Sequence, residues 1–187
     1  MDWADYDLFA PGVSAPLRKL PRREARAAYQ RLMDSKVHRL DSLAKLLAAN
    51  GVDLASDDAS IQRINDWFRA SVEESPERPG ELLPKWYSVV NDLQLFLGEV
   101  MIERNPQSHW GFVSRRPSDL NYQNAVITGV STTPGDVGTI NIDYLLAQYG
   151  RRVVAGEEDP PDEMLRWIKG ARDRIDLTEE IAGRERS

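Results

Sequence analysis

The side chains with the clearest chemical potential lie in and just after one predicted helix, at about residues 85–104. Glu99 and Glu103 are four residues apart, so they share a helix face on which two carboxylates can hold a cation or a proton between them. Asp92 lies on the same polar stripe, and His109 follows the helix as a candidate general base. These four residues form a candidate polar site, and Glu99, Glu103 and His109 would support a small hydrolase or a ligand-binding domain.

The patterns that usually accompany such chemistry are absent from the sequence. A di-metal carboxylate site needs Glu-x-x-His pairs on facing helices, and neither His38 nor His109 belongs to such a pair. The Gly-x-Ser-x-Gly elbow, the His-Glu-x-x-His motif, the P-loop and the dinucleotide-binding fingerprint are also missing. Because there is no cysteine, disulfides, thiolate catalysis and cysteine-based zinc sites are excluded. We therefore expect no catalytic residue, no metal and no cofactor, and a solvated or salt-bridged stripe is the simpler interpretation of Glu99 and Glu103.

A second candidate region is the N-terminal segment 1–20, which mixes aromatic and acidic side chains and shows no regular period. We expect it to form an extended arm. Its aromatic rings either pack on the chain itself or anchor a short acidic peptide on another protein, since aromatic anchors carry much of the energy of interfaces. The predicted partner-binding residues are Asp2, Trp3, Asp5, Tyr6, Asp7 and Phe9.

The densest basic group spans Arg18 to Arg26, at the start of the first predicted helix, where the helix dipole does not favour positive charge. This group could contact nucleic acid or an acidic protein. The formal net charge of -6 and the pI of about 5.0 oppose non-specific binding to phosphate backbones. A nucleic-acid-associated protein is therefore an alternative that ranks below protein interaction, and an ordinary solvated helix face is the simplest interpretation.

The elements that must position these residues are mostly helical. With 187 residues, 41% of them hydrophobic, the chain is long and apolar enough for one globular domain. Periodic apolar residues predict helices at 21–50, at roughly 60–74, at 85–104, after Asn141 and from Asp162. Strands are expected at 109–113 and 124–130, and the proline-rich stretch 74–84 and residues 133–136 are expected to be a loop and a turn.

The sequence thus predicts an α+β fold, mostly helical, with about five helices around a central helix and a small antiparallel β-hairpin or sheet. The helix at 85–104 should be the central one, because it is apolar on more than one side. Gly98 within it indicates close approach of a neighbouring element, and two strands alone would need a third strand or the helices for support. We expect an arm at 1–20, a single domain at 21–176 and a polar tail at 177–187.

The N-terminus lacks a basic and an apolar signal region, and no apolar run approaches the roughly 20 residues that span a bilayer. The acidic balance also argues against docking on an anionic membrane. We therefore expect a cytoplasmic protein.

One stretch resembles a loose group of small uncharacterised bacterial proteins. It consists of Asp-Leu-Gln-Leu-Phe-Leu-Gly-Glu at 92–99, then Asn105-Pro106, then Trp110 in a strand. The pattern of the group is a helix that ends near Leu-Gly-Glu and is followed by a hairpin bearing a tryptophan. Some similar proteins look like partners or immunity factors for bacterial toxins, and the resemblance implies no catalytic residue.

These observations together favour a non-catalytic bacterial interaction protein over an enzyme. An immunity-type inhibitor or a subunit of a larger assembly is the expected class. The expected partner is another protein with a basic surface, whereas the sequence does not fix the oligomeric state.

Overall fold

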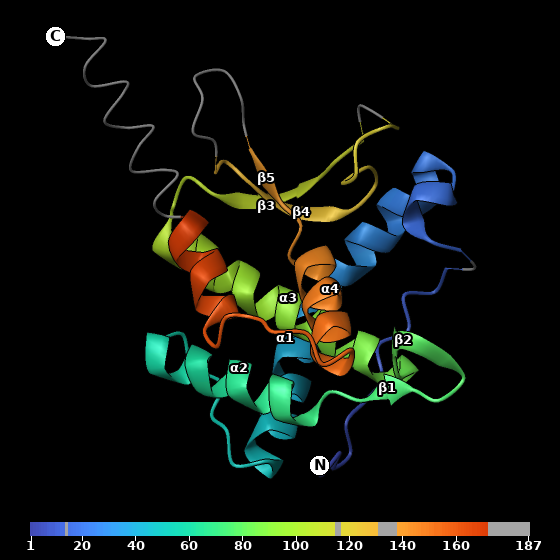
Figure 1. Ribbon diagram of the computed structural model, residues 1–187. Helices are drawn as coiled ribbons and strands as arrows, with labels where there is room; N and C mark the ends of the chain where they lie inside the picture. The colour runs from blue at the N-terminus through green and yellow to red at the C-terminus, as the bar shows by residue number, and fades with distance from the viewer. Residues whose placement is uncertain (14, 115–116, 131–137, 172–187) are drawn as a thin grey trace, which may run out of the picture. The chain divides into compact units, whose positions relative to one another are not determined.

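A computed structural model describes residues 1–13, 15–114, 117–130 and 138–171 of the chain (Figure 1). The described residues confirm the predicted class, an α+β fold that is mostly helical with small antiparallel sheets. The turn predicted at 133–136 and the tail predicted at 177–187 lie outside them. The helical elements are η1 (Leu17–Lys19), α1 (Arg22–Ala49), α2 (Asp58–Ser71), α3 (Pro84–Arg104), α4 (Ile142–Val154) and a segment at 163–171. The strands are β1 (Glu74–Ser75), β2 (Arg78–Leu82), β3 (His109–Phe112), β4 (Ala125–Thr128) and β5 (Thr139–Ile140).

The predicted helices are present, and local signals explain where they begin and end. The helix α1 starts just after Pro21, and the chain leaves it through Gly51, whose φ of 74° suits only glycine without strain. The helix α2 starts two residues before the predicted position because Asp57 caps it, with its Oδ1 accepting a hydrogen bond from the Ser60 amide at 3.0 Å.

The stretch 74–84 is not simply a loop, as the sequence had indicated, but contains a two-stranded antiparallel sheet. Strands β1 and β2 pair Glu74 with Leu82 and Ser75 with Arg78. The prolines and glycine that predicted a loop are compatible with this sheet, because a two-stranded sheet consists of edge strands that tolerate proline. Burial of Leu82 and Ser75 supplies the packing that so short a pair needs.

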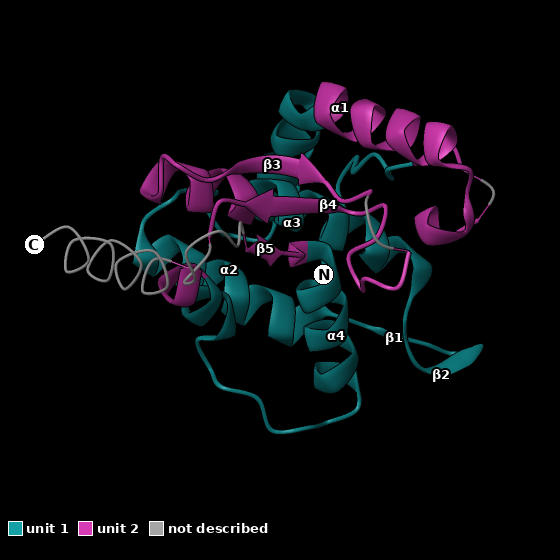
Figure 2. Ribbon diagram, turned by 90° about the horizontal axis from the view of Figure 1, so that it is seen from above, with its two compact units in different colours: residues 1–10, 36–96, 143–167 teal, residues 11–35, 97–142, 168–187 magenta. Residues whose placement is uncertain are grey.

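The chain divides into two compact units (Figure 2). Their formal charges are opposite in sign. Unit 1 comprises Met1–Ala10, Lys36–Phe96 and Asp143–Trp167, and unit 2 comprises Pro11–Ser35, Leu97–Ile142 and Ile168–Ser187. Unit 1 holds ten Lys and Arg against 19 Asp and Glu, a formal charge of -9, whereas unit 2 holds 14 against 11, a formal charge of +3. The acidic balance of the sequence is therefore concentrated in unit 1. The predicted division into an arm, one domain and a tail stays a prediction.

Unit 1 has an aromatic core. The Trp86 ring of α3 lies 5.7 Å from the rings of Trp67 and Phe68 on α2, between ring centroids. Phe68 in turn stacks on Tyr149 of α4 at 5.7 Å. All four rings are buried, so they supply much of the hydrophobic driving force of this unit.

Unit 2 is built around the three-stranded antiparallel sheet, whose strand order is β3-β4-β5. The register pairs Trp110 with Ile127 and Ile127 with Ile140, so the predicted hairpin gains a third strand. The Trp110 ring lies directly on Gly98 of α3, where any Cβ would overlap the ring. The predicted close approach at Gly98 is therefore confirmed.

The helix α3 is the enclosed helix that the sequence predicted. Its bounds differ from the prediction by one residue at the N-terminal end, and every residue from Ser88 to Gly98 is buried. Among the described helices, none combines the length and the apolar character needed to cross a membrane.

Candidate interaction site

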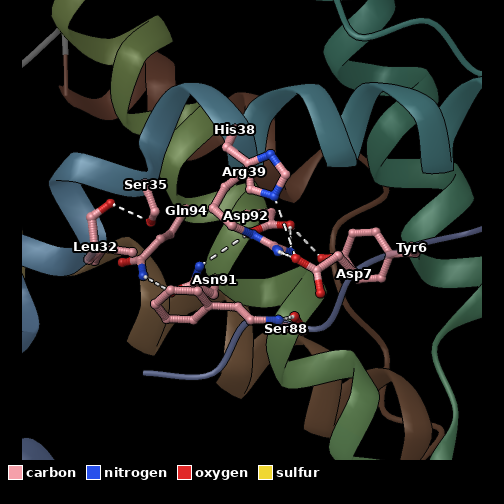
Figure 3. A network of polar contacts seen from close by, with 11 residues as sticks. Tyr6, Asp7, Leu32, Ser35, His38, Arg39, Ser88, Asn91, Asp92 and Gln94 are labelled. Carbon is pink, nitrogen blue, oxygen red and sulfur yellow. Dashed lines mark hydrogen bonds and ion pairs between the residues drawn. The ribbon is translucent and has the colours of Figure 1, made fainter. Parts of the chain in front are cut away.

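A buried ion pair between α1 and α3 is the centre of the polar network in unit 1 (Figure 3). Arg39 of α1 donates from Nε to Asp92 Oδ1 at 2.8 Å and from Nη2 to Asp92 Oδ2 at 2.6 Å. The Arg39 side chain is 2% exposed and that of Asp92 is fully buried. Two parallel hydrogen bonds between a guanidinium and a carboxylate fix both side chains and offset the cost of removing them from water.

Two further donors complete the surroundings of Asp92. The Tyr6 hydroxyl donates to Asp92 Oδ2 at 2.5 Å, and Asn91 Nδ2 donates to Asp92 Oδ1 at 3.2 Å. Burial, followed by the negative charge of Asp92, raises the pKa of Tyr6 far above its ordinary value, so the hydroxyl keeps its proton. With four donors on its two oxygens, the Asp92 carboxylate serves to hold structure and is poorly placed to accept a proton from a substrate.

The N-terminal arm is bound to unit 1 through its three aromatic residues. The rings of Tyr6 and Phe9 lie 5.4 Å and 5.7 Å from the Arg39 guanidinium, and the Trp3 ring meets the Trp86 ring edge-on at 5.3 Å. Backbone contacts add to this, since the Phe9 amide donates to Ser88 Oγ at 2.5 Å. The aromatic residues predicted as partner anchors are thus half-buried on the chain itself.

The arm runs along α1 in the opposite direction. Its start is fixed at Asn50, whose side chain exchanges hydrogen bonds of 3.0 Å and 2.7 Å with the backbone of Asp2. Farther along, Asp7 Oδ2 lies 3.5 Å from both His38 Nε2 and Arg39 Nη1. This course buries one side of the arm and leaves the predicted acidic residues Asp2, Asp5 and Asp7 exposed.

Exposed apolar side chains accompany these carboxylates at one place. Leu8 is 54% exposed and Val37 is 79% exposed, and each is the chain neighbour of a residue in the Asp7–His38 contact. We call the surface formed by Asp5, Asp7, Leu8, Val37 and His38 the arm face. Because large apolar side chains bordered by charge are typical of recognition surfaces, the arm face is the strongest candidate site in unit 1.

The structure places the other predicted polar residues in unit 2. Glu99 is half-buried and its Oε1 accepts a hydrogen bond from the Trp110 indole at 2.8 Å. Glu103 is exposed, and His109 is exposed with Nδ1 3.5 Å from the carbonyl of Gln107. Asp92 belongs to unit 1 and is engaged with Arg39. Within the described ranges, no three carboxylate or imidazole side chains lie close enough together to hold a metal ion.

The basic residues that begin α1 are all on the surface of unit 2. Arg18 and Lys19 lie in η1, and Arg22, Arg23 and Arg26 lie in the first two turns of α1. All five side chains are exposed. Arg22 Nη2 donates to Ser114 Oγ at 3.0 Å, and the Arg26 guanidinium lies 4.9 Å from the centroid of the Phe112 ring.

Sequence reasoning missed Arg39 and misplaced Val37. Val37 fits the three- and four-residue spacing of the apolar residues in α1, which predicts it on the buried face, yet it is 79% exposed. Counting turns of 3.6 residues from the buried Leu32 and Leu43 would have put Arg39 on that face instead. A charged residue at a buried helical position is the signal that indicates a partner elsewhere in the chain.

A second polar cluster in unit 1 was also missed. Glu81 of β2 accepts hydrogen bonds from the Tyr87 hydroxyl at 2.5 Å and from Arg151 Nε and Nη2 at 3.0 Å and 2.9 Å. The hydrogen bond from Tyr87, followed by that from Arg151, lowers the pKa of Glu81. These half-buried groups tie β2 to α3 and α4, and they are fully engaged with one another.

The sequence matches no known protein family, and neither the curated proteins nor the solved structures include one with significant similarity to the chain.

Proposed function

We propose that this protein is a non-catalytic interaction module that binds a basic protein through the arm face of unit 1. An immunity-type inhibitor and a subunit of a larger assembly are the two forms such a module would take. The observation that carries the proposal is the contact between Asp7 and His38, whose chain neighbours Leu8 and Val37 are large apolar residues exposed to solvent.

The charge of unit 1 supports a basic partner. A formal charge of -9 creates a negative potential that speeds the approach of a positively charged protein and repels acidic ones. The apolar pair would then supply the contact that excludes water at the centre of the interface. Charge alone would give a fast but weak encounter, so both features are needed.

The fixed course of the arm also supports the proposal. An arm held by the Trp3, Tyr6 and Phe9 rings presents Asp5 and Leu8 in a defined geometry before any partner arrives. Because the arm is already ordered in the folded chain, binding through it costs less conformational entropy than binding through a disordered peptide.

The proposal is tested by recovering the tagged, full-length chain from its native host under non-denaturing conditions. We expect a basic protein to co-purify with the wild-type chain and to be lost from the Leu8→Ser/Val37→Ser variant. The matched control is Leu120→Ser, which removes a leucine of unit 2 that is 75% exposed. This control should retain the partner.

A second experiment addresses the hydrolase alternative. The Glu99→Ala/Glu103→Ala/His109→Ala variant should retain the same partner, because none of the three residues belongs to the arm face. If the wild-type chain recovers no partner and instead turns over a substrate in a hydrolase screen, with that turnover lost in the triple variant, the proposed function is wrong.

A further inference from the structure

We propose that a second recognition surface, on unit 2, binds the phosphate backbone of nucleic acid without sequence preference. This surface, the basic stripe, consists of Arg18, Lys19, Arg22, Arg23 and Arg26. It shares no residue with the arm face and is independent of the function proposed for that face.

The charges of the basic stripe are not neutralised by the part of the chain that the structure describes. All five side chains are exposed, and no described carboxylate forms an ion pair with any of them. Other basic residues of the chain behave differently, since Arg39, Arg151 and Arg152 each pair with a carboxylate. Five uncompensated cations that lie close together in sequence form a local positive potential.

Two of the arginines are held in place by contacts that leave their charge intact. Arg22 donates to the neutral hydroxyl of Ser114, and Arg26 lies over the Phe112 ring. The two residues are one helical turn apart, so both guanidinium groups lie on the same side of α1. Cations fixed in this way lose little side-chain entropy when they bind an anion.

The placement of these charges does not serve the stability of α1. The first turns of a helix carry the positive end of its dipole, so cations there are slightly destabilising. Between Leu17 and Arg31 there are six basic residues and one acidic residue, Glu24. Binding of an external anion explains this concentration of basic residues better than the stability of the helix does.

Nucleic acid fits the basic stripe better than an acidic protein. Four of its five cations are arginines, whose planar fork matches phosphate oxygens. A protein interface would also need an apolar anchor, and none of the exposed large hydrophobic side chains in the described residues lies between 17 and 31. Unit 2, which carries the basic stripe, has a formal charge of +3, so it attracts phosphate although the whole chain is acidic.

The test is fluorescence anisotropy of the chain with labelled RNA of about 20 nucleotides and duplex DNA of about 20 base pairs. These lengths exceed the common binding-site sizes of single-strand-binding proteins. We expect binding at about 50 mM salt that weakens by several hundredfold or less towards about 200 mM, as roughly five phosphate contacts imply. The Arg22→Glu/Arg23→Glu/Arg26→Glu variant should lose most of this affinity, and its salt slope should fall by about 1 for each contact removed.

The matched control is Lys45→Glu/Arg78→Glu/Arg166→Glu, which changes the net charge equally at three exposed positions of unit 1. This control should bind as the wild-type chain does, and thermal melting should show that both variants are folded. The Leu8→Ser/Val37→Ser variant should also bind normally, which separates this proposal from the function of the arm face.

Three results would overturn the proposal. The first is that the wild-type chain does not bind either nucleic acid at low salt. The second is that the stripe variant and the control lose affinity equally, which would show an effect of net charge alone. The third is that stripe-dependent binding occurs only with polyglutamate or with phosphatidylserine vesicles, which would assign the basic stripe to an acidic protein or a membrane surface.

Discussion

The two halves of α1 use arginine in opposite ways. In the C-terminal half, which belongs to unit 1, Arg39 is buried and its Nε and Nη2 both donate to Asp92. In the N-terminal half, which belongs to unit 2, Arg22, Arg23 and Arg26 are exposed and make no ion pair with a described carboxylate. The same side chain therefore stabilises the fold in one half and remains available for recognition in the other.

The difference teaches that burial, more than residue type, decides the role of a charge. Removing a guanidinium from water costs several kcal/mol unless a carboxylate and further hydrogen bonds compensate it, as Asp92 does for Arg39. An exposed guanidinium bears no such cost and contributes little to folding. The predictions below should separate the two roles.

The largest effect is expected from breaking the buried pair. Asp92→Ala leaves the Arg39 charge buried without a partner, so the free energy of unfolding should fall by about 3–5 kcal/mol. Urea unfolding followed by circular dichroism measures this loss. The Arg39→Met/Asp92→Leu double variant removes both charges and should be clearly more stable than either single variant. A loss below about 1 kcal/mol in Asp92→Ala would show that water reaches the pair, and the comparison would then fail.

A smaller effect is expected from the hydroxyl that completes the pair. Tyr6→Phe removes one hydrogen bond to a charged group and keeps the ring beside Arg39, so unfolding should become easier by about 1.5–3 kcal/mol. Tyr144→Phe is the matched control, because Tyr144 is exposed on α4. Equal effects of the two substitutions in urea unfolding would contradict the role assigned to Tyr6.

The pH dependence of stability gives a third test. The pKa of Tyr6 is raised in the folded chain, so the proton is bound more tightly there than in the unfolded chain. Stability from this group is complete below the unfolded pKa of about 10 and is lost as the pH rises above it, by at most about 1.4 kcal/mol per pH unit. Urea unfolding between neutral and alkaline pH should therefore show a steeper decline for the wild-type chain than for Tyr6→Phe. Parallel declines would indicate that the other tyrosines with raised pKa, such as Tyr29 and Tyr87, account for the whole effect.

The smallest effect is expected in the basic stripe. Replacing Arg22, Arg23 or Arg26 by alanine should change the free energy of unfolding by less than about 0.5 kcal/mol each, because these side chains are exposed. A slight stabilisation is expected where an unfavourable charge leaves the start of α1. Should any of these changes destabilise the chain as much as Asp92→Ala, the exposed arginines would have a structural role and the comparison would lose its meaning.

The sequence predicted the parts of the fold that depend on local signals. The bounds of α3 and the end of α1 near residue 50 follow from periodicity, and the close approach at Gly98 follows from a glycine in a costly helical position. The sheet of β1 and β2 was missed because Pro76, Pro79 and Gly80 are typical of loops, whereas here they lie at edge and turn positions.

The candidate site was less accessible to sequence reasoning, because its contacts join distant segments. Arg39 and Asp92 are 53 residues apart, and no local spacing links them. The acidic and aromatic character of the arm was evident from the sequence, but which side of it is buried depends on α1 and α3. The sequence alone could not show that Val37 of the arm face is exposed, because the position of Val37 fits the apolar stripe of α1.

The distance along the chain between the arm and its binding site has a consequence for synthesis. Tyr6 forms a hydrogen bond to a residue 86 positions later, so the arm leaves the ribosome well before α3 has been made. During that interval the arm lacks its contacts with α3, and the nascent chain exposes a short aromatic sequence to chaperones. Synthesis that pauses before α3 is complete should therefore increase chaperone capture and aggregation, even though the finished protein hides the same rings.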